Sequence, residues 1–553
     1  MSKNSKLYKK ILIWRYKHIS ERQFIYILSI VVGFLAGFGT FILKDLTFLI
    51  EAFLQGKFIK DYYYSLYFIF PIIGLFLVYY IKKYVIKKEI GHGISTTLHA
   101  ISRRNGIIKR YKIVASLLTA PITVGFGGSA GLQGPAVSTG AALGSNIAQL
   151  FHMNSKTRML LIGCATAGAM ASMFQAPIAA IIFAVEIFSL DLAFASLVPL
   201  LLASVSAVLS SYLLTGTNVL FRFRLLDVFE VRDIPFYIVL AFLTGVASVY
   251  FSRMYFTITR FFERFKSSFK RLLIGGIAIG VMLFLIPPLY GEGYGLINNL
   301  LKGNTAEALK DIPYNLDLEN VYIVVLMLLL IAVFKAIAMT TTFAAGGVGG
   351  IFIPTIFMGA ALGNAIAKVI NQFGFHVSES NFTLIGMTGL MAGVLHAPLT
   401  AIFLIAEITG GYELFVPLML VSAISYAFTK YFVSNSIYTV ELAKKGQLIT
   451  HNKDKNVLML MRIDNLIEKN FKAITPEMNL GEMLKKSVAK SKRNIFPVLD
   501  DEKQFLGIVL LDDIRPMMFD QSQYTETYVS DFMKAAPSII FKDDSIETVM
   551  TKF

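Results

Sequence analysis

Long apolar segments dominate this sequence from residue 24 to about residue 433. The clearest of them are 24–44, 66–86, 193–215, 235–256, 272–290, 320–340 and 414–433. Each has about the 20 largely apolar residues that a helix needs to cross a bilayer. Hydrophobic residues make up 55% of the chain and charged residues only 16%, against roughly 25% charged in an average soluble domain. The sequence therefore predicts a polytopic α-helical membrane protein.

Basic residues at the edges of the first apolar segments indicate how the chain is oriented. The net charge is +16, and Lys and Arg gather in 2–23, 82–88 and 103–112. The positive-inside rule places such edges in the cytoplasm. We therefore expect a basic cytoplasmic N-terminus (1–23) and a multi-pass protein of the cell (inner) membrane with both termini inside. Orientation in the membrane explains this charge without a nucleic-acid partner.

Other apolar segments are interrupted by glycine and proline, and they come in pairs. Residues 131–146 (GLQGPAVSTGAALGSN) match 350–365 (GIFIPTIFMGAALGNA) at an offset of 219. Residues 170–187 match 391–408 at an offset of 221. Broken helices at membrane depth are tolerated only where protein or a water-filled cavity satisfies their backbone. Interrupted segments at corresponding positions of two halves indicate a transport pathway.

A soluble region follows the membrane segments. After a linker at 446–455, residues 456–553 are rich in charge. The pattern predicts a helix over 475–486 and short strands at 495–499 and 506–511. A weaker second copy begins about 66 residues later and stops at Phe553 before its strands. We expect a small α/β domain with an incomplete second module.

Three glycine-rich motifs precede apolar helices and predict an anion site. They are Gly91-His-Gly-Ile-Ser95, Gly131-Leu-Gln-Gly-Pro135 and Gly350-Ile-Phe-Ile-Pro354. The N–H groups and the positive dipole at a helix N-terminus favour an anion. None of the motifs contains a carboxylate or a lysine. Such a site binds without a full countercharge, which suits conduction because a permeating ion must also leave.

These motifs, in this order, resemble the CLC family of chloride channels and proton-coupled anion exchangers over about residues 24–446. The family's GSGIP, GxEGP and GxFxP motifs and its late tyrosine align with the three motifs and with Tyr438. The resemblance implies two inverted-topology repeats with broken re-entrant helices in a transmembrane domain (24–445), and a homodimer in the lipid bilayer with one anion pore per subunit. The tail resembles paired CBS modules, of which the second is truncated. The implied anion-binding residues are His92, Gly93, Gln133, Gly134, Ile351, Phe352, Ile353 and Tyr438.

Three departures from the family pattern bear on mechanism. The gating glutamate of GxEGP is Gln133, which has neither its charge nor its proton. The internal proton-accepting glutamate of the exchangers is Ile187, which follows Glu186 and cannot titrate. The serine of GSGIP is His92, whose imidazole can donate a hydrogen bond, and the proline is Ser95. Glu186 is interpreted as structural or as lying beside the pore.

The leading prediction is a passive chloride channel uncoupled from protons, because both proton positions are non-titratable. An H⁺/Cl⁻ exchanger that uses other groups is the alternative. A CBS-regulated cation transporter is a remote alternative, because it needs acids that converge at the midplane. The main embedded acids of this sequence are Glu186 and Glu407, and the glycine-rich helix starts have the wrong polarity for cations. A sensor without transport does not explain the duplicated broken helices.

The sequence shows no catalytic triad and no phosphate loop, so an enzyme is not predicted. Its single cysteine excludes a four-cysteine metal site. Chloride is the expected permeant ion and no cofactor is expected. An adenine nucleotide at the CBS region remains open, with Asp513 where some CBS modules hold a ribose.

Overall fold

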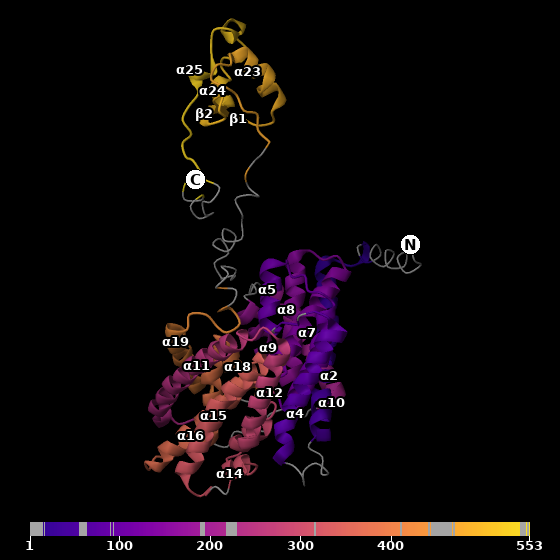
Figure 1. Cartoon of the computed structure of the whole chain (residues 1–553), viewed down its shortest axis with the longest axis vertical. Coiled ribbons are helices and arrows are strands. Elements are labelled where there is room, and N and C mark those ends of the chain that lie inside the picture. Colours follow the sequence, from indigo (N-terminus) through magenta and orange to yellow (C-terminus); the bar gives the residue numbers. More distant parts are fainter. Residues whose placement is uncertain are drawn as a thin grey trace, which may run out of the picture. The chain divides into compact units, whose positions relative to one another are not determined.

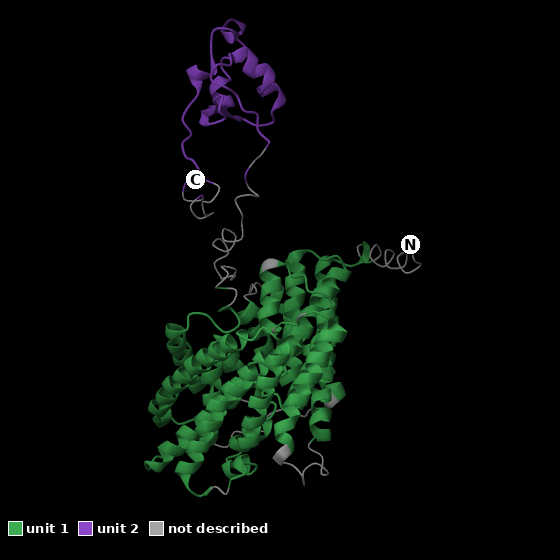
Figure 2. Cartoon of the chain, viewed as in Figure 1, with its two compact units in different colours: residues 1–448 green, residues 449–553 purple. Residues whose placement is uncertain are grey.

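The computed structural model describes residues 17–54, 64–88, 90–91, 93–188, 194–216, 229–314, 317–409, 412–440 and 470–541, together with five isolated residues, Arg15, Ala443, Ile467, Val549 and Lys552. The chain divides into two compact units, residues 1–448 and 449–553 (Figure 2). Each unit is described by itself.

The first unit is a helical membrane domain. Among the described residues, nine helices are long and apolar enough to span a bilayer, which confirms the predicted polytopic architecture. Its first half contains α2 (Glu21–Leu54), α4 (Tyr64–Tyr80), α5 (Gly93–Arg103), α6 (Tyr111–Gly125), α7 (Gln133–Leu150), α8 (Ser155–Phe174), α9 (Pro177–Phe188) and α10 (Phe194–Thr215). A π-helical turn, η1 (Ile81–Ile86), extends α4.

The second half, coloured from magenta to orange in Figure 1, contains a similar series of long and short helices. It contains α11 (Ile234–Glu263), α12 (Ser268–Leu285), α13 (Tyr294–Leu301), α14 (Thr305–Leu309), α15 (Val321–Ala344), α16 (Phe352–Gln372), α17 (Glu379–Leu395), α18 (Pro398–Ile408) and α19 (Phe415–Phe432). The helix α12 ends before the end of its predicted apolar segment, 272–290. Pro287 and Pro288 form a 3₁₀ turn there with Leu289, because proline cannot continue the hydrogen bonds of a helix.

Reciprocal hydrogen bonds join the two halves at equivalent positions. Ser129 N–H donates to Thr342 Oγ1 at 3.2 Å, and Val348 N–H donates to Thr123 Oγ1 at 3.0 Å. Both pairs exchange members at the sequence offset of 219. An antiparallel β-bridge links Gly131 to its equivalent in the second half. This exchange is what a two-fold relation between inverted repeats produces, and it confirms the predicted repeats.

The core of the membrane domain is built from the broken helices. Helix α7 packs against α8 (Figure 1). Helix α16 packs against α17. Of the helices that can span the membrane, α8 and α16 are the most enclosed. The long helices α2, α11 and α15 leave large apolar side chains exposed, as lipid-facing helices do. The site motifs therefore lie inside the protein.

The second unit contains a small α/β fold. Strand β1 (Ile495–Leu499) pairs antiparallel with β2 (Phe505–Leu510). Helices α23 (Leu480–Lys486), α24 (Leu511–Ile514) and α25 (Val529–Phe532) accompany them. The predicted helix start at 475 is wrong: α23 begins at Leu480 because the side chain of Asn479 accepts the N–H of Glu482 at 2.8 Å as an N-cap. The predicted second helical repeat, 546–550, lies almost wholly outside the described residues.

Candidate anion-binding site

The three glycine-rich motifs converge on one small cavity. Its volume is about 20 Å³, and a single water needs roughly 10–15 Å³ by the same measure. Four residues predicted from the sequence line it: Gly93, Gly134, Ile351 and Tyr438. The other lining residues are Ile94, Ser95, Tyr255, Phe343, Gly349, Gly350 and Ile437. The cavity therefore suits one small ion or molecule.

Main-chain atoms approach one another closely around this cavity. Gly131 and Gly350 exchange two backbone hydrogen bonds, of 2.9 and 2.6 Å. A Cβ on Gly350 would lie 2.6 Å from the backbone nitrogen of Gly134. A Cβ on Gly93, whose φ is +23°, would lie 2.7 Å from the carbonyl oxygen of Gly134. Side chains at these positions would separate the N-termini of α5, α7 and α16, so the glycines allow three positive helix ends to face one point.

Tyr438 contributes a hydroxyl group to the same cavity. Its side chain is buried, and its Oη has no hydrogen-bond partner among the described residues. A buried hydroxyl without a partner loses the hydration that it had in water. An anion in the cavity would accept a hydrogen bond from this hydroxyl, so the arrangement fits a site of neutral donors.

Three of the remaining predicted anion-site residues lie at the helix starts near the cavity, and one lies outside the described residues. Phe352 and Ile353 are fully buried at the start of α16. The ring of Phe352 packs against that of Phe174, with centroids 5.5 Å apart. Gln133 is fully buried at the start of α7, and its amide donates to Glu292. His92 lies outside the described residues.

The two embedded acids that the sequence singled out cap each other's helices. Glu186, near the end of α9, accepts the N–H groups of Leu399 at 3.2 Å and Thr400 at 2.8 Å, at the start of α18. Glu407, near the end of α18, accepts the N–H groups of Ile178 at 3.1 Å and Ala179 at 2.8 Å, at the start of α9. These acids satisfy free N–H groups at helix starts, and they do not converge on the small cavity.

Ile187 packs against the hydrophobic core of the domain. Its side chain carries no group that can accept or release a proton. Ile187, the residue after Glu186, thus packs against the core and has no group for proton transfer.

Sequence reasoning missed a group of ionisable side chains around Glu292, whose carboxylate accepts a hydrogen bond from Gln133. Glu292 precedes α13, Lys44 and Glu51 lie on α2, and Lys335 lies on α15. Lys335 is fully buried and donates to the carbonyl oxygens of Leu289 at 3.3 Å and of Gly291 at 2.9 Å. A lone lysine in an apolar span is a signal for function. The acid in Gly291-Glu-Gly293, directly after two prolines, was a second such signal.

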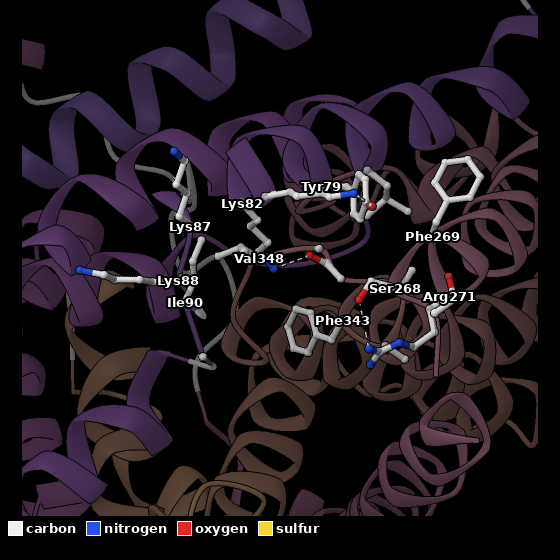
Figure 3. A pocket seen from close by; sticks show the side chains of 18 residues that line it. Tyr79, Lys82, Lys87, Lys88, Ile90, Ser268, Phe269, Arg271, Phe343 and Val348 are labelled. Atoms are coloured by element: carbon white, nitrogen blue, oxygen red, sulfur yellow. Dashed lines mark hydrogen bonds between the residues drawn. The ribbon is translucent and has the colours of Figure 1, made fainter. Parts of the chain in front are cut away.

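A larger basic cavity shares the lining residue Phe343 with the anion cavity. Its volume is about 750 Å³. Lys82, Lys83, Lys87, Lys88 and Arg271 line it together with Phe343, which also lines the small cavity (Figure 3). The Nζ of Lys82 donates to the carbonyl oxygen of Gly346 at 2.7 Å. Clustered cations with few acids raise the local concentration of anions.

In the tail, Asp513 lies on α24 and forms an ion pair with Lys534, with Nζ and Oδ1 2.8 Å apart. The carboxylate of Asp513 is thus paired with a cation of the same domain.

Comparison with known families identifies the membrane domain. The family described as voltage gated chloride channel matches residues 73–430. The chain belongs to the CLC family. The CBS domain family matches residues 463–519, so the soluble unit of this CLC protein contains a CBS domain. Membership in the CLC family establishes anion transport as its general function.

Curated relatives of this CLC protein have different activities in their names. "Chloride channel protein CLC-f" of Arabidopsis thaliana is 25% identical over 77% of this chain. This chain covers 60% of that relative's length. A voltage-gated ClC-type chloride channel, ClcB of Citrobacter koseri, is 28% identical over 60% of this chain and 75% of its own length. An H⁺/Cl⁻ exchange transporter, ClcA of Vibrio cholerae, is 27% identical over 57% of this chain and 66% of its own length.

Solved structures confirm the fold. A slow cyanobacterial Cl⁻/H⁺ antiporter matches with a TM-score of 0.66 and 19% identity, over 77% of this chain and 98% of its own. A eukaryotic CLC transporter matches with a TM-score of 0.64 and 16% identity, over 95% of this chain and 92% of its own.

Proposed function

We propose that this CLC protein conducts chloride passively, without coupling to protons. The observation that carries the proposal is the chemistry of the two positions where the family's exchangers hold protons. The outer position is the buried amide Gln133, and the inner one is Ile187, which packs against the core. Neither side chain titrates, so neither exchanges a proton during anion movement.

The anion cavity supports the same proposal. Gly93, Gly134, Ile351 and Tyr438 offer backbone N–H groups and one hydroxyl. Neutral donors hold an anion without a fixed countercharge, so the bound state need not be deep. The basic cavity (Figure 3), which shares the lining residue Phe343 with the small one, would collect anions at one entrance. An anion would move from the basic cavity to the small one and leave by the N-terminus of α7.

Chloride efflux from liposomes tests the proposal. The purified full chain is reconstituted with internal chloride, and external chloride and external pH are recorded together. We expect efflux only after valinomycin provides a counter-flux of K⁺, with no proton movement linked to chloride. Uptake of protons driven by a chloride gradient would refute it. Protein-free liposomes are the control.

One observation favours an H⁺/Cl⁻ exchanger as the second candidate. Glu292 hydrogen-bonds Gln133 and places a titratable group beside the outer position. The same efflux experiment separates the two candidates, because only an exchanger moves protons against their gradient.

The arrangement of the subunits and the role of the tail are proposed from family membership. We expect a homodimer in the inner membrane with both termini cytoplasmic. Light scattering of the detergent-solubilised protein tests the dimer. Binding of ATP to the full chain, lost in Asp513→Ala, would establish a nucleotide site.

A further inference from the structure

A carboxylate reaches the N-terminus of α7 from another part of the chain. One oxygen of Glu292, Oε1, accepts the backbone N–H of Leu132 at 2.9 Å and the Nε2 of Gln133 at 3.3 Å. The hydroxyl of Tyr294 donates to the same oxygen at 3.4 Å. Glu292 is buried. An acid thus occupies the helix start where an anion would leave, although residue 133 is an amide.

The loop before α13 holds Glu292 in this place. Lys335 binds the carbonyl oxygens of Leu289 and Gly291 immediately before it. The hydroxyl of Tyr290 donates to the carbonyl oxygen of Gly125, at the end of α6. These contacts tie the loop to α15 and α6, so the position of the carboxyl group is built into the fold.

A separate cavity connects Glu292 with titratable groups nearer the surface. Its volume is about 380 Å³, and Glu51, Glu292 and Tyr294 line it with Glu307, Lys310 and Asp311. Glu51 lies at the far end of α2 from the basic N-terminus. The 34 residues of α2 span about 51 Å at 1.5 Å per residue, more than the roughly 30 Å of a bilayer core. The cavity therefore belongs to the membrane side opposite the basic segments.

Charged groups of both signs surround Glu292. Lys44 and Glu51 face it from α2, Lys335 from α15 and Tyr294 from α13. Glu292 lies in the connection between two spans, and its burial raises the pKa of the carboxyl above its ordinary value, while the hydrogen bond from Leu132 lowers it by a smaller amount. Protonation at mildly acidic pH is therefore accessible to this group.

We propose that Glu292 is a titratable gate at the outer end of the anion path, acting in place of a glutamate at position 133. The ionised carboxylate takes up the free N–H of α7 and repels an arriving anion. A proton from water in the 380 Å³ cavity neutralises it, after which an anion can compete for that N–H. Gln133 suits both states, because an amide can donate to the carboxylate or, turned over, accept from the acid.

This inference rests on the proposed anion path, and chloride efflux measured with pH set separately on each face tests it. Wild-type efflux should rise as the pH falls on the face opposite the basic N-terminus, with a slope of at most about tenfold per pH unit, the limit for one titrating group. Glu292→Gln should lose this dependence and give at neutral pH the efflux that the wild type reaches in acid. Glu307→Gln is the matched control, because Glu307 lines the same cavity but is about half exposed and pairs with Lys310. It should keep the wild-type profile.

Two results would overturn the gate. One is a wild-type chloride efflux that does not change with the pH on either face. This result needs no variant, so it does not depend on whether Glu292→Gln folds. The other is a Glu292→Gln profile identical to that of the wild type. Either result leaves passive conduction intact. Proton pumping by the wild type would instead refute passive conduction, and loss of that pumping in Glu292→Gln would still support a proton-accepting Glu292.

Discussion

Replacing Glu186 with alanine removes the acceptor of three hydrogen bonds at the start of α18. These come from the backbone N–H of Leu399, the backbone N–H of Thr400 and the Oγ1 of Thr400, the last at 2.6 Å. A hydrogen bond to a charged group contributes about 1.5–3 kcal/mol. Leu399 is 53% exposed, so the lower end applies, and the loss is about 4.5 kcal/mol for three bonds.

Thermal unfolding of the detergent-solubilised variants measures this loss. Glu407→Ala removes two backbone bonds at the equivalent place on α9, and about 3 kcal/mol by the same estimate. Thr400→Val removes only the hydroxyl bond and should cost least. The expected order of stability is therefore wild type, Thr400→Val, Glu407→Ala and Glu186→Ala. Inactivation half-lives at one temperature give the same order if unfolding is irreversible.

The opposite pattern would refute the reasoning. An unchanged unfolding temperature in Glu186→Ala would show that these hydrogen bonds do not stabilise the fold. If the same variant also changes proton movement or the pH profile of chloride efflux, Glu186 carries protons. Its hydrogen bonds to α18 would then be incidental.

Three further outcomes are expected. Gln133→Glu would place a second carboxylate beside Glu292, where the Gln133 Nε2 now lies 3.3 Å from the Glu292 Oε1. Two negative charges at that distance repel each other by about 5 kcal/mol at an effective dielectric constant of 20. The pair should share one proton, and efflux at neutral pH should fall and recover in acid; an unchanged pH profile would place residue 133 outside the path. Tyr438→Phe should weaken chloride binding measured by calorimetry by about 1.5–3 kcal/mol without lowering the thermal stability of the chloride-free protein, whereas Tyr250→Phe should leave binding unchanged. Phe496→Ala should cost the CBS domain about 3–5 kcal/mol, seen as faster hydrogen exchange in β1 and β2, because Phe496 is fully buried; equal exchange rates would contradict this.

The spans and the repeats could be predicted because both depend on patterns that are visible in the sequence itself. Apolar length marks the spanning helices, and the offset of 219 marks residues that the fold later places as partners, as in the bridge between Gly131 and Gly350. Four of the eight predicted anion-site residues line one cavity. Gly93, Gly134 and Ile351 do so because their motifs lie at helix starts. The roles of these residues stay predictions.

The surroundings of Gln133 could not be predicted in the same way. The contact of Glu292 with Leu132 joins positions 160 residues apart, and no repeat or motif relates them. The capping by Glu186 and Glu407 was hidden for a similar reason, since each acid serves the other half of the chain. The start of α23 was misplaced because Thr475 and Asn479 are both residues that cap helices, and only the hydrogen bond to Glu482 distinguishes them.

The reversal potential of the purified protein in a planar bilayer tests passive chloride conduction most directly. Chloride is kept equal on both sides while a pH gradient is imposed. The account predicts a reversal potential of zero at every pH gradient, even though the size of the current changes with pH through Glu292. A reversal potential that shifts with the proton gradient would show that protons and chloride move together, and would contradict uncoupled conduction.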